Sequence, residues 1–141
     1  MTVSKKTAAT VTTLGALTAA IALAAPTAGA AVTRIDIAPG LSFGSSGSYG
    51  TGCSYTVTAT ARPGVAVVFL DEVDGFRTTD TLKPVGPVAD ASGKASTTWT
   101  PAKKGEHKIW AAEYIAGETY FLTSVTVGTG LNAGPACVVL P

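Results

Sequence analysis

The sequence predicts an all-β fold, an antiparallel sandwich of about seven short strands, and three observations support this prediction. Short segments alternate between apolar and polar residues with the period of two that a half-buried strand requires. Turn signals that contain Gly, Pro or Asp separate these segments. No segment after residue 30 repeats its apolar residues with the period of a helix. Short strands separated by turns in this way are typical of β-sandwiches.

The first 30 residues are expected to form a signal peptide rather than part of the fold. Lys5 and Lys6 form a short positive region, and an apolar, alanine-rich stretch follows at 14–25. A small-x-small motif of the kind that signal peptidase recognises ends at residue 30. The apolar stretch is shorter than the roughly 20 residues of a comfortable membrane span. We therefore expect cleavage before Ala31 and a single domain that spans residues 31–141.

The predicted mature domain is nearly neutral and carries no basic stripe. The whole chain has 10 Lys and Arg residues, so removal of Lys5 and Lys6 leaves 8 against 9 Asp and Glu, a formal charge of −1. This balance argues against a nucleic-acid partner, and no segment indicates stable membrane insertion after cleavage. We expect a secreted protein, extracellular or associated with the cell surface. Its expected partner is an extracellular protein or surface component, and no cofactor is expected.

Cys53 and Cys137 are the only cysteines, and both lie in the predicted exported domain. Two cysteines in an oxidising compartment usually pair. The bridge would close a loop of about 84 residues and, in the chain-entropy account, stabilise the fold by roughly 4–5 kcal/mol. Two cysteines and the distant His107 lack the ligand spacing of metal sites. We therefore expect a disulfide and no bound metal.

Seven segments are expected to form strands, and their composition indicates where each one lies. The alternation is clearest at 53–61, where threonines on one face suit a solvated strand surface. The segment 65–71 is apolar on both faces, which is typical of a central strand. Pro84 and Pro87 exclude a regular central strand at 76–89 and leave a short edge strand with a loop. The other strands are expected at 33–38, 94–100, 106–114 and 119–127.

Two segments are expected to lie outside the sheets. Residues 41–52 are rich in Gly and Ser, a composition that disfavours a packed element. Residues 128–141 follow the last expected strand and are predicted to be a coil tail. Cys137 would fasten this tail beside Cys53, so the bridge is expected to clasp the C-terminal end.

Alternation also assigns side chains to the faces of the sheets. Trp99 is assigned to the core. If Ile109 faces the core, then Trp110 faces outward, and the same argument places Val68 and Leu70 outward on the neighbouring strand. These three residues would form an exposed apolar patch, which usually marks a contact surface, and Trp is favoured at binding hot spots. The alternative is that a bulge or a neighbouring loop covers Trp110.

Signals for catalysis or metal binding are sparse. Asp71, Glu72 and Asp74 form an acidic group that is either a solvated turn or a calcium site, because carboxylates at a turn suit a hard cation. His107 is the only histidine and is expected at the start of a strand, facing the edge of the sandwich. A general base also needs a positioned nucleophile and an orienting carboxylate, and the sequence indicates no such constellation around His107. We therefore expect a non-enzymatic protein with no catalytic residues.

An apolar strand that runs into an acidic turn, two glycine-containing strand starts and an alternating final strand stand out in the second half of the chain. They are Val67, Phe69, Asp71, Asp74-Gly75, 91–95, 105–107, Ile109, Ala111 and 124–127. Together they resemble the bacterial immunoglobulin-like domains of secreted and surface proteins. The resemblance implies an immunoglobulin-like sandwich and a module that acts by binding or as an extracellular structural protein. Unlike most such domains, this one has its own cysteine pair, and we expect it to occur as a single copy.

A strand start built from small residues around a turn glycine, at 89–97, is similar to that of secreted chromoproteins of the apo-neocarzinostatin type. This second resemblance implies an alternative function as a small-molecule carrier. The ligand would lie between the sandwich and the loop at 41–52, with Phe43, Tyr49 and Tyr120 as walls. Members of that family carry two short-loop disulfides, whereas this chain has two cysteines in total.

Overall fold

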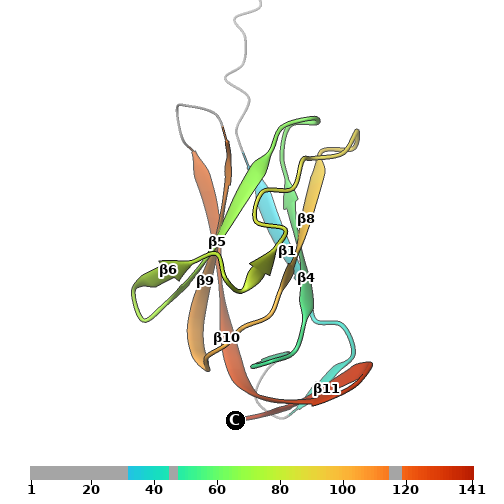
Figure 1. Ribbon diagram of the computed structural model, residues 1–141, viewed down its shortest axis with the longest axis vertical. Coiled ribbons are helices and arrows are strands. Elements are labelled where there is room, and N and C mark those ends of the chain that lie inside the picture. Colours follow the sequence, from blue (N-terminus) through green and yellow to red (C-terminus); the bar gives the residue numbers. More distant parts are fainter. Residues whose placement is uncertain (1–31, 45–47, 115–118) are drawn as a thin grey trace, which may run out of the picture.

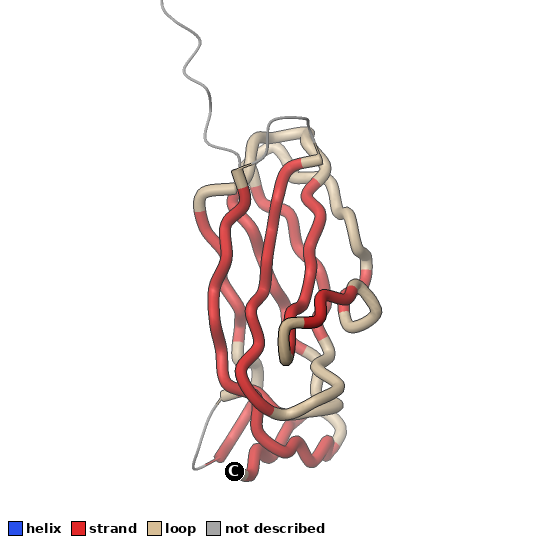
Figure 2. Tube along the Cα trace, turned by 90° about the vertical axis from the view of Figure 1, so that its left-hand side faces the viewer, coloured by secondary structure: helices blue, strands red, loops and turns tan. Residues whose placement is uncertain are grey.

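The computed structural model describes residues 32–44, 48–114 and 119–141, and its strands form two facing sheets (Figure 1). Every regular element in these residues is a strand, as Figure 2 shows after a quarter turn. The part of the chain that the structure describes contains no helix of the length and hydropathy that a membrane crossing requires. The two facing sheets, built of strands alone in the described residues, confirm the predicted all-β sandwich. The predicted signal peptide, residues 1–30, lies outside the described residues.

The smaller sheet has four antiparallel strands in the order β1-β4-β8-β7. Its two central strands pair from Tyr55 opposite Trp99 to Thr60 opposite Lys94. Odd-numbered residues of both strands are buried, as the period of two predicts. The strands of this sheet are β1 (Arg34–Ala38), β4 (Tyr55–Thr60), β8 (Lys94–Trp99) and β7 (Leu82–Lys83).

The larger sheet has the order β2-β11-β10-β9-β5-β6, and β3 pairs in parallel with β10 off this path. Strand β9 is antiparallel to both β5 and β10 and lies between them. The short strand β6, together with β7 of the other sheet, corresponds to the irregular edge expected at 76–89. The strands are β2 (Ser42–Gly44), β3 (Tyr49–Gly50), β5 (Val67–Val73), β6 (Phe76–Thr78), β9 (Gly105–Glu113), β10 (Tyr120–Ala133) and β11 (Ala136–Leu140).

The core between the sheets is built around an aromatic cluster. Trp99 is fully buried, and the ring centroids of Tyr55 and Tyr49 lie 5.8 and 5.9 Å from its own. Phe69 and Ile109 contribute fully buried side chains from the larger sheet. The assignment of Trp99 to the core is therefore confirmed, because its strand alternates as the sequence predicts.

Residues 128–141 do not form the expected coil tail. Strand β10 continues through this region, and β11 folds back on it as an antiparallel hairpin. The prediction was wrong because Gly128 and Gly130 interrupt the apolar alternation. Both glycines permit close backbone contact, since a Cβ atom would collide with the carbonyl oxygen of Leu140 at Gly128 and with that of Thr51 at Gly130.

The Gly- and Ser-rich segment 41–52 also contributes strands to the larger sheet. Strand β2 pairs in parallel with β11, and β3 pairs in parallel with β10. The predicted disulfide joins Cys53 and Cys137, whose Cα atoms lie 6.1 Å apart. The bridge therefore fastens a paired hairpin, rather than a coil, to Cys53, two residues before β4.

Candidate functional site

The outward face of the larger sheet carries an apolar patch that three strands build in register. Strands β5, β9 and β10 are paired so that two rows of apolar residues cross them. Neighbours in register share a face of the sheet, so the side chains of both rows point outward. This group is the outer patch, and it consists of the row Leu70–Trp110–Leu122 and the row Val68–Ala112–Tyr120.

Trp110 lies at the centre of its row, between two other side chains that contact solvent. Its ring centroid is 4.5 Å from that of Tyr120, with the two planes tilted by 51°. The guanidinium carbon of Arg77 lies 4.1 Å from the indole centroid, a cation–π distance. Tyr120 is 58% exposed and Leu122 is 38% exposed, whereas Trp110 is half-buried. The sequence analysis did not place Tyr120 and Leu122 in this patch, because only strand pairing shows that β10 adjoins β9.

A charged rim borders the outer patch on the side of β6. Glu72 accepts a hydrogen bond from Arg77 Nε at 2.7 Å, and Lys108 Nζ lies 3.9 Å from its other oxygen. The hydrogen bond from Arg77 is the main reason that the pKa of Glu72 lies below its ordinary value. The Trp110 indole adds to this lowering, although its buried N–H makes no hydrogen bond of good geometry. Glu72 therefore holds Arg77 in place over the indole ring.

The inward face of the same sheet carries a buried polar group, the Asp71 cluster, made of Asp71, Thr81, Trp99 and His107. His107 Nδ1 lies 2.7 Å from Asp71 Oδ1, while Trp99 Nε1 and Thr81 Oγ1 each donate to Oδ2 at 2.9 Å. His107 belongs to β9, Trp99 to β8 of the opposite sheet, and Thr81 to the segment between β6 and β7. The Asp71 cluster therefore joins the two sheets through the core.

The contacts of His107 favour an ion pair with Asp71. His107 Nε2 lies 2.8 Å from the carbonyl oxygen of Lys103, which only accepts, so this nitrogen carries a proton. Burial lowers the pKa of His107, but the hydrogen bonds to Asp71 and Lys103 outweigh burial and raise the pKa above its ordinary value. Burial raises the pKa of Asp71, but the hydrogen bonds from His107 and Trp99 outweigh it and lower that pKa.

These positions correct the expected acidic group. Asp71 points into the core, Glu72 points to the outward rim, and Asp74 lies in the turn after β5 with φ of 53°. Successive residues of a strand face opposite sides of the sheet, so the three carboxylates do not converge on a cation. In residues 32–44, 48–114 and 119–141, no group of three or more His, Cys, Asp or Glu is placed to hold a metal ion.

The expected position of His107 at the edge of the sandwich is also wrong. The side chain is 1% exposed, and both ring nitrogens are engaged within the core. The residue does begin the inward alternation of β9, but the Trp99 ring of the opposite sheet packs against it, with ring centroids 5.5 Å apart. No nitrogen of His107 is therefore free to accept a proton from a substrate.

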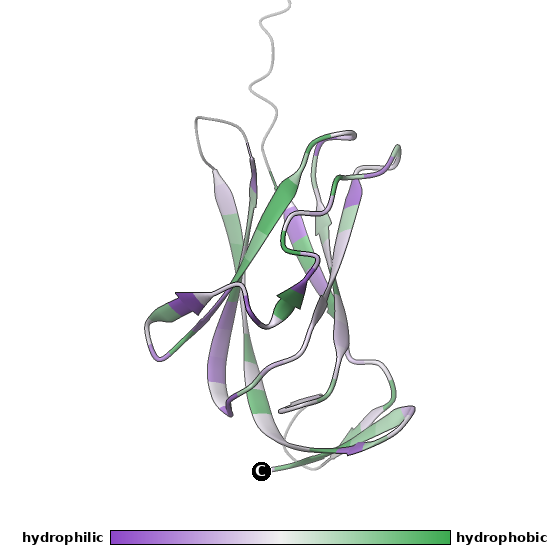
Figure 3. Ribbon diagram, viewed as in Figure 1, coloured by the Kyte–Doolittle hydropathy of each residue, from purple (hydrophilic) through white to green (hydrophobic). Residues whose placement is uncertain are grey.

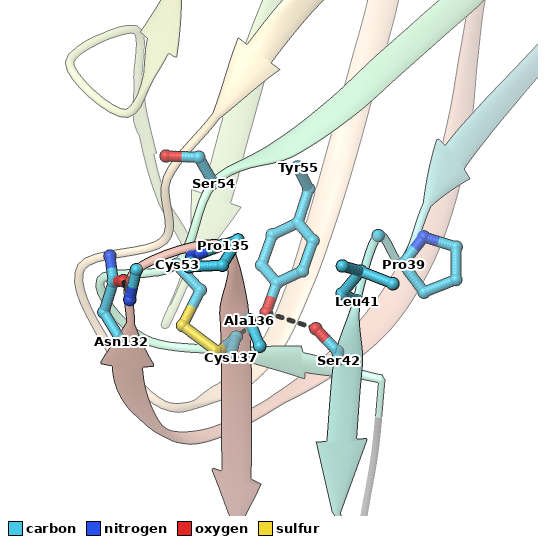
Figure 4. A pocket seen from close by; sticks show the side chains of 12 residues that line it. Pro39, Leu41, Ser42, Cys53, Ser54, Tyr55, Asn132, Pro135, Ala136 and Cys137 are labelled. Atoms are coloured by element: carbon cyan, nitrogen blue, oxygen red, sulfur yellow. Dashed lines mark hydrogen bonds between the residues drawn. A yellow bond between two sulfur atoms is a disulfide. The ribbon is translucent and has the colours of Figure 1, made fainter.

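A small pocket lies beside the disulfide, between the chain before β2 and the β10–β11 turn (Figure 4). Its volume is about 170 Å³. Among its lining residues, the Tyr55 hydroxyl accepts a hydrogen bond from Ser42 Oγ at 3.3 Å and donates one to Cys137 Sγ at 3.6 Å. Three of the lining residues, Ser42, Tyr55 and Cys137, thus already bond to one another.

The three aromatic residues expected to form a carrier cleft do not meet. The Tyr49 ring packs against the core, and its hydroxyl donates to the Ile37 carbonyl at 2.8 Å. Tyr120 begins β10 in the outer patch, whereas Phe43 lies in β2, beside the hairpin at the other end of β10. None of the three lines the pocket beside the disulfide. The expectation of a cleft with these walls is therefore wrong.

Comparisons with known proteins found solved structures of low sequence identity. No protein-family model and no curated protein matches the chain. The D00-D0 domain of Intimin is 21% identical with a TM-score of 0.47, and the match covers 68% of this chain and 46% of that one. The PKD domain of an M14-like peptidase from Thermoplasmatales archaeon SCGC AB-540-F20 is 18% identical with a TM-score of 0.35. That match covers 68% of this chain and 94% of that one.

Proposed function

We propose that this chain is a secreted, non-catalytic immunoglobulin-like module that binds an extracellular protein or surface component through the outer patch. The observation that carries the proposal is the position of Trp110 in an outward row between two leucines. An antiparallel sheet with one solvated face normally carries polar residues there. The outer patch therefore has the composition of a contact surface.

Two further residues extend this surface beyond the outer patch. Tyr114 is 79% exposed and donates its backbone N–H to the Ala66 carbonyl, and Val88 is 62% exposed and bridges to Ala66. Both adjoin the row that contains Val68. The apolar surface thus runs from the end of β9 across β5 to the segment that follows β7.

The other sheet supplies the contrast. The outward residues of β4 and β8 are mainly Thr and Ser, and Thr58 and Ser96 hydrogen-bond to each other at 2.9 Å. An apolar outward face is therefore a property of the larger sheet and not of the fold. Trp and Arg are enriched at binding hot spots, and Arg77 of the charged rim lies over the Trp110 ring of the outer patch.

The disulfide supports export. Cys53 and Cys137 are bridged and buried, and such bridges persist in oxidising compartments. Together with the predicted signal peptide, the bridge favours an extracellular or surface location. The lack of a free ring nitrogen on His107 supports a role in binding rather than catalysis.

Site-specific photo-crosslinking tests the proposal. A benzophenone side chain in place of Leu122 samples the outer patch, and the same group in place of Thr98 samples the polar outward face of β8. With the extracellular fraction of the source cells, we expect a discrete crosslinked product from position 122 and none from position 98. Equal labelling, or no product from either position, contradicts the proposal.

A substitution tests whether Trp110 carries the contact. We expect Trp110→Ala to reduce the crosslinked yield from position 122 by roughly thirtyfold, the effect of a hot-spot residue. The matched control Thr98→Ala should leave the yield unchanged. The melting temperature of Trp110→Ala should stay close to that of the parent. A collapse in melting temperature would instead make Trp110 a residue of the core.

A further inference from the structure

At the end of the molecule that is marked C in Figure 1, the larger sheet continues as a short segment. This segment consists of β2, β11 and residues 129–133 of β10, with β11 in the middle. We call it the tip. Its inward side chains, Cys137 and Val139, are buried. Its outward side chains include the row Phe43–Val138–Leu131, which crosses all three strands in register.

The outward face of the tip is apolar and open to solvent. Five large apolar side chains are exposed on this part of the chain, each by more than a third of its surface. They are Leu41 at 60%, Phe43 at 61%, Leu131 at 52%, Val138 at 38% and Leu140 at 42%. Figure 3 draws β11 mainly in the colours of hydrophobic residues. The group is separate from the outer patch, whose residues on β10 lie toward the start of that strand.

The chain that builds the tip also lacks side chains that are charged at neutral pH. Neither 37–61 nor 119–141 contains Asp, Glu, Lys, Arg or His. A protein interface requires only one apolar face and tolerates charges on its rim. Insertion into lipid is opposed by any charge that is carried below the headgroups. The tip has no charged side chain on either face or edge, which matches the second requirement.

Charged residues begin immediately beside the tip. Lys103 and Lys104 are exposed in the loop before β9, and Lys104 Nζ lies 3.5 Å from the carbonyl oxygen of Pro141. Glu106 is exposed close by, so the rim has mixed sign. Long lysine side chains at such a boundary reach toward headgroups while apolar side chains lie deeper. Apolar burial, rather than attraction to anionic lipid, would therefore dominate binding.

The size of the tip argues against a second copy of the chain as its partner. Strand β11 has 5 residues, so three strands of that length cover roughly 250 Å². A stable dimer buries about 800 Å² on each partner. Insertion of a few side chains into a bilayer interface has no such minimum area, because the lipid adapts to their shape. Backbone groups are also satisfied at the centre of the tip, since β11 is paired on both sides.

We propose that the tip docks on a lipid surface, with Phe43, Leu131 and Val138 inserted among the upper acyl chains of one leaflet. Binding is reversible and of the order of that of a single acyl chain, about 10⁴ M⁻¹. The body of the sandwich and the outer patch stay in water. The inference rests on the tip alone and holds whether or not the outer patch binds a partner.

Vesicle flotation with the purified, disulfide-bonded protein tests the proposal. We expect the protein to float with phosphatidylcholine vesicles, to gain only slightly from added phosphatidylglycerol, and to stay bound at high salt. Leu131→Asp should lower the partition coefficient at least about tenfold, because a charge then enters the interface. Leu122→Asp is the matched control, since it places the same charge at an exposed leucine of β10 in the outer patch, and it should leave flotation unchanged.

A second measurement locates the insertion. In a Phe43→Trp variant, we expect a blue shift of tryptophan emission on addition of phosphatidylcholine vesicles, whereas the parent should show none. Absence of flotation overturns the proposal, as does equal loss from Leu131→Asp and Leu122→Asp. Binding that requires phosphatidylglycerol and disappears at high salt also overturns it. A dimer that Leu131→Asp dissociates would assign the tip to a second copy instead.

Discussion

Strands β5 and β9 present two faces whose residues alternate one by one, yet the two faces differ in how completely their groups are paired. Inward, Val67, Phe69 and Ile109 are fully buried, and Asp71 receives three hydrogen bonds. Outward, apolar side chains contact water and the buried N–H of Trp110 has no well-formed hydrogen bond. The difference indicates that the inward face stabilises the fold, whereas the outward face is available for contact.

A second inward carboxylate follows the same rule as Asp71. Glu113, at the end of β9, accepts hydrogen bonds at 2.8 Å from both the backbone N–H and Nε of Arg62. The hydrogen bonds from Arg62 hold the pKa of Glu113 below its ordinary value against the opposing effect of burial. Each buried carboxylate of this sheet is thus charged and matched by donors, as buried polar groups generally are.

The largest difference in stability between the two faces should come from removing the adjacent carboxylates of Asp71, which faces inward, and Glu72, which faces outward. Asp71→Ala leaves a buried imidazolium and an indole N–H without their acceptor, so we expect a loss of about 3–5 kcal/mol in the free energy of unfolding. Glu72→Ala removes a carboxylate from the outward rim and should change stability little. Denaturant unfolding of both variants measures the difference. Similar losses in the two variants would show that the two faces do not differ as described. If Asp71→Ala does not fold, Asp71→Asn replaces it in the comparison.

The two tryptophans should differ by a smaller amount. Trp99→Phe removes a buried donor to the Asp71 carboxylate, which we expect to cost about 2–3 kcal/mol. Trp110→Phe removes an N–H that has no well-formed partner and keeps an aromatic ring beside Tyr120, so its effect should be well below that. Thermal unfolding followed by circular dichroism ranks the two variants. If Trp110→Phe lost more stability than Trp99→Phe, the stabilising hydrogen bonds would not lie on the inward face.

Isosteric polar substitutions probe the apolar positions of β5. Val67→Thr places a hydroxyl in the core, and we expect a loss of about 1–2 kcal/mol. Val68→Thr places the same hydroxyl on the outward face, where water can hydrate it, and the change should stay within about 0.5 kcal/mol. Paired urea titrations compare the two. Equal losses would mean that the outer patch is covered in the folded protein.

The smallest effect should be the pH dependence that the Asp71 cluster contributes. The raised pKa of His107 gives stabilisation that is complete below about pH 6.5 and is lost as pH rises through the folded-state value. The lowered pKa of Asp71 gives stabilisation that is present above about pH 3.9 and is lost as pH falls through its folded-state value. We therefore expect the unfolding midpoint in urea to decline on the alkaline side.

The alkaline decline is the diagnostic part of this profile, because Glu72, Asp90 and Glu113 also have lowered pKa values and contribute to the acid side. A His107→Gln variant should be less stable than the parent at pH 6 and should lose the decline between neutral and alkaline pH. A decline of equal size in that variant would assign the effect to other groups.

Much of the fold could be predicted from local patterns, and the misses have a common cause. Alternation at 53–61 and 94–100 correctly identified β4, β8 and the inward position of Trp99. The hairpin of β10 and β11 was missed because its strands include Gly128 and Gly130, which are chosen for close backbone contact and not for alternation. Strands β2 and β3 were missed for a similar reason, since two or three residues of a Gly-rich segment carry no readable period.

The candidate site was predictable only in part. Val68, Leu70 and Trp110 follow from alternation, and the structure places them side by side on the outward face; their role in binding stays a prediction. Tyr120, Leu122 and Arg77 required strand order and side-chain contacts. The acidic group at 71–74 was misjudged because the sequence of an apolar strand does not show whether hydrogen-bond donors face its carboxylate across the core.

By itself, the sequence determined the class of the fold, the alternation of the principal strands and the cysteine pair, because a period of two and a residue count are local properties. Only the tertiary structure decided that Asp71, Trp99 and His107 meet between two sheets. It alone also decided that β2 and β11 bring the exposed side chains of Phe43 and Val138 together at the tip. These contacts join residues that are far apart in the chain, and their geometry depends on strand order, register and the packing of one sheet on the other.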